Sequence, residues 1–140
     1  MSKKNPKLKR SNTEVEFGKR EVQELLRCAN DPIYFILTYV KIVHPLRGLI
    51  DFELYDYQKD LVQSYLDNRF FVVLSARQTG KTETTSAFLL WYAMFQERRT
   101  ILVVSNKASG SKEIIGKLQS MYEELPHWLS LIHISEPTRR

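Results

Sequence analysis

Residues 75–82 read Ser-Ala-Arg-Gln-Thr-Gly-Lys-Thr and place a glycine, a lysine and a threonine in the order that phosphate-binding loops use. The segment, which we call the 75–82 loop, matches Gly-x-x-x-x-Gly-Lys-Ser/Thr except at the first position, where Ser75 replaces glycine. Such a loop turns successive backbone N–H groups and a helix N-terminus toward a polyphosphate. We expect Lys81 to reach the β- and γ-phosphates and the Thr82 hydroxyl to bind Mg²⁺. The pattern therefore predicts a site for ATP and Mg²⁺.

The residues of this loop have separate expected roles. Gly80 lies where the main chain must bend close to a phosphate and a β-carbon would crowd it, and Ser75 is small enough to replace the first glycine. Arg77 has two interpretations: it stabilises charge on the γ-phosphate in the transition state, or it forms a salt bridge that shapes the loop. Lys81 and Arg77 are the candidate catalytic residues. The candidate nucleotide-binding residues are Ser75, Ala76, Arg77, Gln78, Thr79, Gly80, Lys81 and Thr82. The alternative is an ordinary strand-to-helix turn with an exposed lysine.

Tyr57 and Gln58 lie upstream of the loop and form a second candidate binding motif. A glutamine amide can pair with both the N6 donor and the N7 acceptor of adenine. A tyrosine ring offers a face on which a base stacks. The pair therefore predicts an adenine-binding position, with Gln58 reading the base. The alternative is a core aromatic residue beside a surface amide.

The elements that would position these residues form a βαβ pattern. Residues 70–74 and 100–104 are apolar, β-branched or aromatic runs, which are typical of strands in a parallel sheet. Residues 81–96 between them are long enough for a crossover helix. This order predicts an α/β fold with a parallel sheet. A further helix is expected over 107–124, ending at Leu125 and Pro126. Ser105, Asn106 and Lys107 would cap it, or contact DNA or the nucleotide from the carboxyl edge of the sheet.

The residues before the sheet predict a helical N-terminal part. Apolar spacing predicts helices over 19–30 and 54–66. Asp31 followed by Pro32 is an N-cap with proline at the first helical position, so a second apolar segment is expected to begin here and to be closed by His44, Pro45 and Gly48. These three residues also predict a loop. Neither His44 nor His127 has partners at metal-ligand spacing.

Composition describes an ordinary single domain with a basic arm. The chain has 140 residues, 43% of them hydrophobic and 26% charged. Its longest apolar run, residues 87–95, is too short to span a membrane, and no secretory signal is evident. Cys28 is the only cysteine, so a cytoplasmic setting is expected. Residues 1–20 hold seven basic and two acidic residues, which accounts for the whole net charge of +5. Residues 1–18 are interpreted as a flexible basic arm, which either binds DNA or an acidic partner or is a solvated tail.

Residues 129–140 have a different character from the rest of the chain. Their sequence is similar to the conceptual translation of a sequencing-library adapter. We therefore expect the natural protein to continue differently after residue 128. Residues 19–128 are expected to form the N-terminal part of an ATPase domain.

With these motifs in order, the chain resembles the N-terminal portion of the large terminase subunit of tailed bacteriophages, the ATP-driven motor that packages DNA into proheads. The resemblance covers residues 20–128 and rests on residues 31–35, 44–45, 57–58, the 75–82 loop and residues 125–126. It implies a partial ASCE-type P-loop NTPase sheet with flanking helices. It also implies double-stranded DNA, a portal protein, a small terminase subunit and a homo-oligomeric ring as partners. The expected location is the host cytoplasm and, transiently, the portal vertex of the prohead.

The sequence also departs from the family pattern. No apolar run ends in Asp-Glu, the acidic pair that would hold Mg²⁺ and activate water, and Glu123 and Glu124 follow a helical pattern instead. No carboxylate cluster of a metal nuclease is visible. The chain alone is therefore expected to bind ATP weakly and to hydrolyse it negligibly. Two alternatives stay open: a helicase-type ATP-dependent translocase, and a non-enzymatic DNA or protein interaction module that uses the basic arm.

Overall fold

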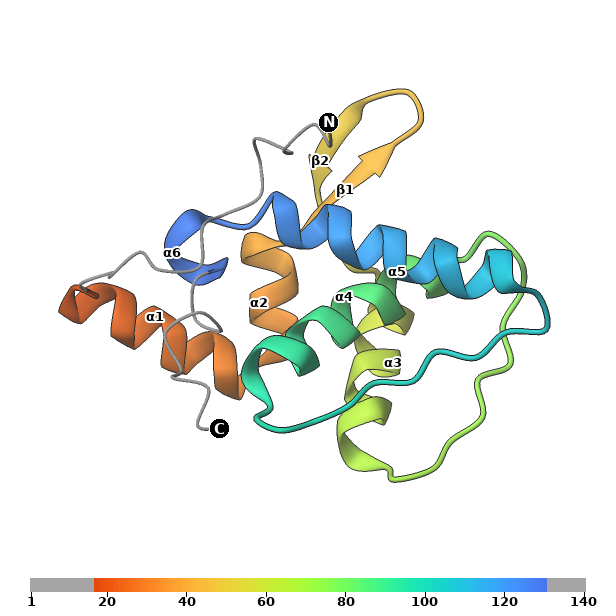
Figure 1. Cartoon of the computed structure of the whole chain (residues 1–140), viewed down its shortest axis with the longest axis horizontal. Helices are drawn as coiled ribbons and strands as arrows, with labels where there is room; N and C mark the ends of the chain where they lie inside the picture. Colours follow the sequence, from red (N-terminus) through yellow and green to blue (C-terminus); the bar gives the residue numbers. More distant parts are fainter. Residues whose placement is uncertain (1–16, 131–140) are drawn as a thin grey trace, which may run out of the picture.

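Helical spacing and capping residues in the sequence correspond to six helices in the computed structural model, which describes residues 17–130 (Figure 1). Within these residues the molecule is a small, mostly helical domain with a single two-stranded antiparallel hairpin. The elements in chain order are α1 (Lys19–Asn30), α2 (Pro32–Tyr39), β1 (Lys41–His44), β2 (Gly48–Asp51), α3 (Asp56–Asp67), α4 (Lys81–Phe95), α5 (Ala108–Glu123) and α6 (His127–Ser130).

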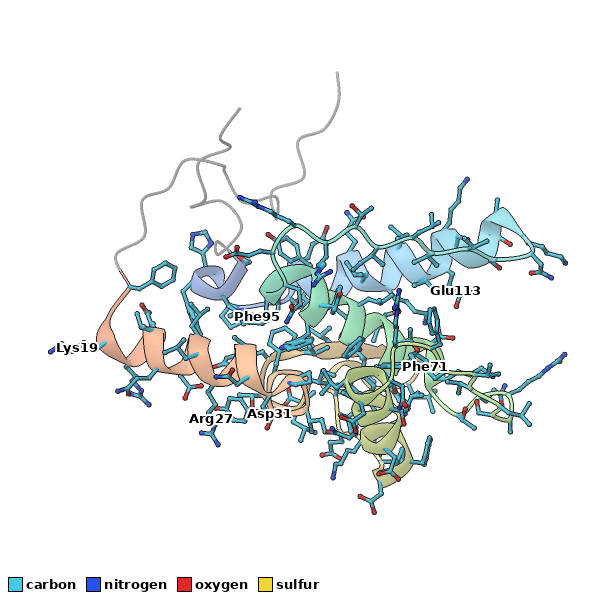
Figure 2. All side chains as sticks on the ribbon, turned by 90° about the horizontal axis from the view of Figure 1, so that it is seen from below. Lys19, Arg27, Asp31, Phe71, Phe95 and Glu113 are labelled. Carbon is cyan, nitrogen blue, oxygen red and sulfur yellow. The ribbon has the colours of Figure 1, made fainter. Side chains whose placement is uncertain are left out.

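The junction between α1 and α2 confirms the prediction made from Asp31 and Pro32. The Asp31 carboxylate accepts a hydrogen bond from the Tyr34 backbone N–H at 3.1 Å, and Pro32 occupies the first turn of α2. Figure 2 shows Asp31 at the turn between the two helices. An N-cap carboxylate satisfies one of the free N–H groups at a helix start, so this short sequence ends one helix and begins the next.

The β1–β2 hairpin corrects the loop that was expected around His44 and Gly48. The strands pair in a register that places Lys41 opposite Asp51 and His44 opposite Gly48. Gly48 has a φ of +71°, a left-handed conformation that glycine adopts without strain. The His44 Nδ1 atom accepts hydrogen bonds from the backbone N–H groups of Leu46 and Arg47, at 3.1 and 3.3 Å. The turn is therefore well built although no strand was predicted beside it.

The predicted parallel sheet is wrong for the described residues. Residues 70–74 and 100–104 join no strand and take part in no backbone–backbone hydrogen bond with any described residue. Figure 1 draws both stretches, between α3 and α4 and between α4 and α5, as plain loops. Val72 is 97% exposed and Leu102 is 83% exposed. Without the sheet, the predicted α/β class and the P-loop NTPase architecture that the resemblance implied are not found here.

The reason for this error is that a strand depends on a neighbour. Apolar and β-branched side chains favour an extended backbone, which is why both runs were predicted to be strands. A strand forms only when its N–H and C=O groups meet those of another strand. The residue types of each run indicate a preference for strand. They do not indicate which other segment would supply the hydrogen-bonding partner that a sheet requires.

Helix α4 forms the centre of the domain instead. It contacts α2, α3 and α5, and its apolar residues point to several sides, as in a helix enclosed by others. Phe95 meets Phe35 of α2 edge-on, with ring centroids 5.5 Å apart, and Figure 2 shows it inside the helical layer. The fully buried large side chains include Phe35, Ile36, Val40, Val62, Leu90 and Leu129.

Cys28 joins α1 to this core. Its side chain is completely buried, and its carbonyl oxygen accepts a 2.7 Å hydrogen bond from the Trp91 indole N–H of α4. Burial raises the pKa of the Cys28 thiol to about 12, because a thiolate would lose its solvation there.

The C-terminal end of the domain agrees in part with the prediction from the sequence. Helix α5 ends at Glu123, just before Leu125 and Pro126 as predicted, and α6 follows. Leu129 and Ser130, the first residues of the expected adapter-like tail, are buried in α6. The rest of that tail and residues 1–16 of the expected arm lie outside the described residues. Among the described helices, none has the length and apolar character that a membrane crossing requires.

Candidate functional site

The 75–82 loop leads directly into α4, so Gly80 is the N-cap of that helix. Gly80 has a φ of +71°, and Gln78 two residues earlier also has a positive φ, of 60°. Thr84 closes the first turn, because its backbone N–H and its hydroxyl both donate to the Gly80 carbonyl oxygen, at 3.0 and 2.9 Å. No side chain caps α4. The first N–H groups of this 15-residue helix are therefore available to an anion.

Gly80 has no room for a side chain. A β-carbon at this position would lie 2.5 Å from the Gln58 Nε2 atom. A glycine was predicted here because a phosphate would approach the main chain. In the structure the group that lies close to Gly80 is the Gln58 amide. The left-handed φ and the contact with Gln58 are two independent reasons for glycine here.

Lys81 folds back over the loop that precedes it. Its Nζ atom donates to the carbonyl oxygens of Ser75 and Ala76, at 3.3 and 3.2 Å. The Thr79 hydroxyl donates to the Ala76 carbonyl at 3.1 Å and lies 3.3 Å from the Ser75 hydroxyl. Ser75 therefore takes part in closing the loop, which the small glycine of the usual pattern could not do with a side chain. The ammonium group is held at the mouth of the loop by neutral oxygens alone.

Thr82 and Arg77, the predicted Mg²⁺ ligand and second catalytic residue, are less constrained. The Thr82 hydroxyl is half-buried and forms no hydrogen bond to any residue in the described range. Arg77 is exposed and forms no ion pair with a residue between 17 and 130. The salt bridge that was one interpretation of Arg77 is therefore not found among these residues.

Tyr57 and Gln58 lie against the loop, as the predicted binding motif requires. The Tyr57 hydroxyl donates to the Thr79 carbonyl oxygen at 2.8 Å, and the Gln58 Nε2 atom donates to the same oxygen at 3.3 Å. The Gln58 Oε1 atom accepts from the Tyr55 backbone N–H at 2.9 Å, at the start of α3. Gln58 is only 3% exposed. Whether it also reads adenine stays a prediction.

An open cleft of about 870 Å³ lies between the hairpin, the start of α3 and the loop. Its walls include His44 and Arg47 from the hairpin turn and residues 78–80 of the loop. Tyr55 and Tyr57 stack nearly parallel at its edge, with ring centroids 5.7 Å apart. Tyr55 belongs to the Tyr55–Gln58 motif that the sequence singled out, whereas His44 and Arg47 were not connected with the site. The β-branched residues on either side of Pro45 and Gly48 were the available signal for the hairpin.

A second cleft, of about 460 Å³, lies on the other side of the loop. This second cleft is lined by residues of α3, by residues 70–74, and by Ser75, Thr79 and Lys81 of the loop and the start of α4. The loop thus separates two open spaces. One of them adjoins the tyrosine stack and the hairpin, and the other adjoins the ammonium group.

Three acidic residues, Asp51, Glu53 and Glu83, lie in the walls of the larger cleft beside the loop. Glu83, in the first turn of α4, forms an ion pair with Lys117 of α5, so it is already neutralised. Within residues 17–130 no cluster of three or more His, Cys, Asp or Glu side chains could hold a metal ion. Ser105 packs on Gly110, and Lys107 is the N-cap of α5 without a side-chain hydrogen bond, so neither contacts the loop.

Comparison of the chain with models of known protein families finds no match.

Proposed function

We propose that the chain binds ATP with Mg²⁺ on the 75–82 loop. The observation that carries the proposal is the geometry at residues 80–82. A left-handed glycine leads straight into an uncapped 15-residue helix, and the next lysine folds back across the loop. Free N–H groups at a helix start, together with a cation, favour a polyphosphate.

The chemistry of the residues fits such a ligand. The Lys81 ammonium group meets two carbonyl oxygens, which are weaker partners than phosphate oxygens. A triphosphate would therefore gain a charged partner that the loop already holds in place. The Thr82 hydroxyl is free to bind Mg²⁺, which takes oxygen ligands. The cleft beside the Tyr55 and Tyr57 stack offers room and an aromatic surface for the base.

We further propose that this ATP site belongs to a viral DNA-packaging motor of the large terminase type. The support is the set of motifs named above, with Tyr57 and Gln58 placed directly against the 75–82 loop. In that function ATP hydrolysis drives double-stranded DNA into the prohead, with a portal protein, a small terminase subunit and further copies of the motor as partners. The acidic pair and the nuclease domain that this activity needs are not among the described residues. The chain by itself is therefore proposed to bind ATP weakly and not to turn it over.

The test of nucleotide binding is a calorimetric titration of the 140-residue chain with MgATP, comparing it with Lys81→Ala. We expect the variant to lose at least about tenfold in affinity, because a hydrogen bond to a charged group contributes roughly 1.5–3 kcal/mol. Lys112→Ala is the matched control, since Lys112 is an exposed lysine of α5 that lines neither cleft beside the loop. Equal affinity in all three proteins would contradict the proposal. In the full-length protein, Lys81→Ala should abolish ATP turnover.

A further inference from the structure

The carbonyl oxygen of Thr79 is the point at which α3 holds the loop. It accepts hydrogen bonds from two consecutive residues of α3, the Tyr57 hydroxyl at 2.8 Å and the Gln58 amide at 3.3 Å. Gln58 is buried, and its other amide atom is fixed by the Tyr55 backbone N–H. Both polar atoms of the Gln58 amide therefore have partners within the chain, which restrains the amide beside the Thr79 carbonyl.

This arrangement fixes the direction of the next backbone N–H group. The described residues contain no cis peptide bond, so the C=O of Thr79 and the N–H of Gly80 point in opposite directions across one planar unit. Because the carbonyl points toward α3, the Gly80 N–H points away from it. That N–H donates to no backbone acceptor among the described residues. It is therefore available to a ligand on the far side of the peptide.

From this geometry we infer that Tyr57 and Gln58 are positioning residues for phosphate recognition. They orient the Thr79–Gly80 peptide so that the Gly80 N–H faces a phosphate oxygen. Glycine at position 80 permits this orientation because it has no β-carbon. A β-carbon there would lie 2.5 Å from the Gln58 amide nitrogen. The inference rests on the proposed nucleotide site and adds to it a role that does not depend on the base.

The role differs from adenine reading in what it predicts. Pairing with N6 and N7 of adenine requires both the donor and the acceptor of one amide at the base edge. In Gln58 both atoms already have partners within the chain, and the side chain is buried. A positioning role lowers the affinity for any triphosphate when it is lost, whereas a base-reading role lowers the affinity for ATP only.

The experiment measures binding of MgATP and of inorganic triphosphate with Mg²⁺ to the 140-residue chain and three variants. Tyr57→Phe removes one hydroxyl and keeps the stacking ring. Gln58→Met removes the amide without adding charge. Tyr92→Phe is the matched control, because it removes a hydroxyl that has no hydrogen bond to a described residue, in a part of α4 that lines neither cleft. Tyr57 is half-exposed, so its variant tests the inference even where Gln58→Met is unstable.

We expect Tyr57→Phe and Gln58→Met to weaken the binding of both ligands by the same factor, about fivefold for one neutral hydrogen bond, and Tyr92→Phe to leave it unchanged. Loss of ATP affinity with unchanged triphosphate affinity would overturn the inference in favour of base reading. Unchanged affinity for both ligands would also overturn it while leaving the nucleotide site intact. If the unsubstituted chain binds neither ligand, the proposed function itself fails.

A second readout needs no ligand. The backbone amide resonance of Gly80, followed by NMR in the ligand-free chain, should move in Tyr57→Phe and Gln58→Met and stay in place in Tyr92→Phe. An unchanged Gly80 resonance in both variants would show that neither side chain orients the peptide.

Discussion

Gly80 is the single residue on which the geometry of the candidate site depends most. Its left-handed backbone and its contact with Gln58 both exclude a side chain. Gly80→Ala should therefore lower the free energy of unfolding by about 1–2 kcal/mol, the usual cost of a left-handed non-glycine residue, and more where Gln58 cannot move aside.

Gly116, in the exposed part of α5, is the matched control for that substitution. A β-carbon there meets no atom within 4 Å. Gly116→Ala should raise the free energy of unfolding by roughly 0.8–1 kcal/mol, because alanine is the better helix former. Urea denaturation of both variants measures the two values. Equal effects of the same sign would contradict this account of Gly80.

The roles of single residues were predictable only where the chemistry is local. The Asp31 cap and the placement of Gly80 and Lys81 at a helix start follow from neighbouring residues, and the structure confirms them. The partner of Gln58 is different, because Thr79 lies 21 residues away along the chain. A sequence pattern identifies a glutamine that can form hydrogen bonds but not the atom that it meets after folding.

At the scale of elements, the same division between local and distant information applies. The predicted helices over 19–30, 81–96 and 107–124 match α1, α4 and α5 to within a residue at each end, because helical spacing and capping are local signals. The hairpin was missed because its strands have only four residues each. The sheet was wrongly predicted because strand pairing joins residues far apart in the chain.

The unpaired segments 70–74 and 100–104 lead to a prediction about association between molecules. Val72 and Leu102 expose nearly their whole side chains on segments whose backbone groups lack partners. Such segments favour association between molecules. Val72→Lys combined with Leu102→Lys should lower the fraction of associated chain seen by light scattering, with a change of no more than about 0.5 kcal/mol in the free energy of unfolding.

Two outcomes would count against that description of the segments. Undiminished association would show that other surfaces cause it. A large loss of stability would show that Val72 or Leu102 is packed in the folded chain. Val62→Lys provides the contrast, because Val62 of α3 is fully buried and a charge there should unfold the domain.

For the molecule as a whole, the buried thiol of Cys28 links folding to pH. Burial raises its pKa from 9.0 to about 12 in the folded chain. Above about pH 9 the unfolded chain releases the thiol proton while the folded chain keeps it. The free energy of unfolding should therefore be highest below pH 9 and fall as the pH rises, by at most about 1.4 kcal/mol per pH unit.

Urea denaturation between pH 8 and pH 10 measures this dependence. The pKa values of Tyr34, Tyr39, Tyr65 and Tyr122 are also raised, so these tyrosines add a loss of stability that begins as the pH approaches 10. Cys28→Ala removes the thiol, and its free energy of unfolding should change less with pH over the same range. Identical slopes for the two proteins would contradict the assignment to Cys28.

The central claim for the whole molecule is that the 75–82 loop receives the triphosphate. The most direct test is a titration of the isotopically labelled 140-residue chain with MgATP, followed through its backbone amide resonances at moderate salt. We expect the largest changes in resonance position at residues 76–82, including Gly80 and Lys81. In Lys81→Ala these changes should be absent. Shifts confined to the basic residues before Gly18, or no shifts at all, would contradict the claim.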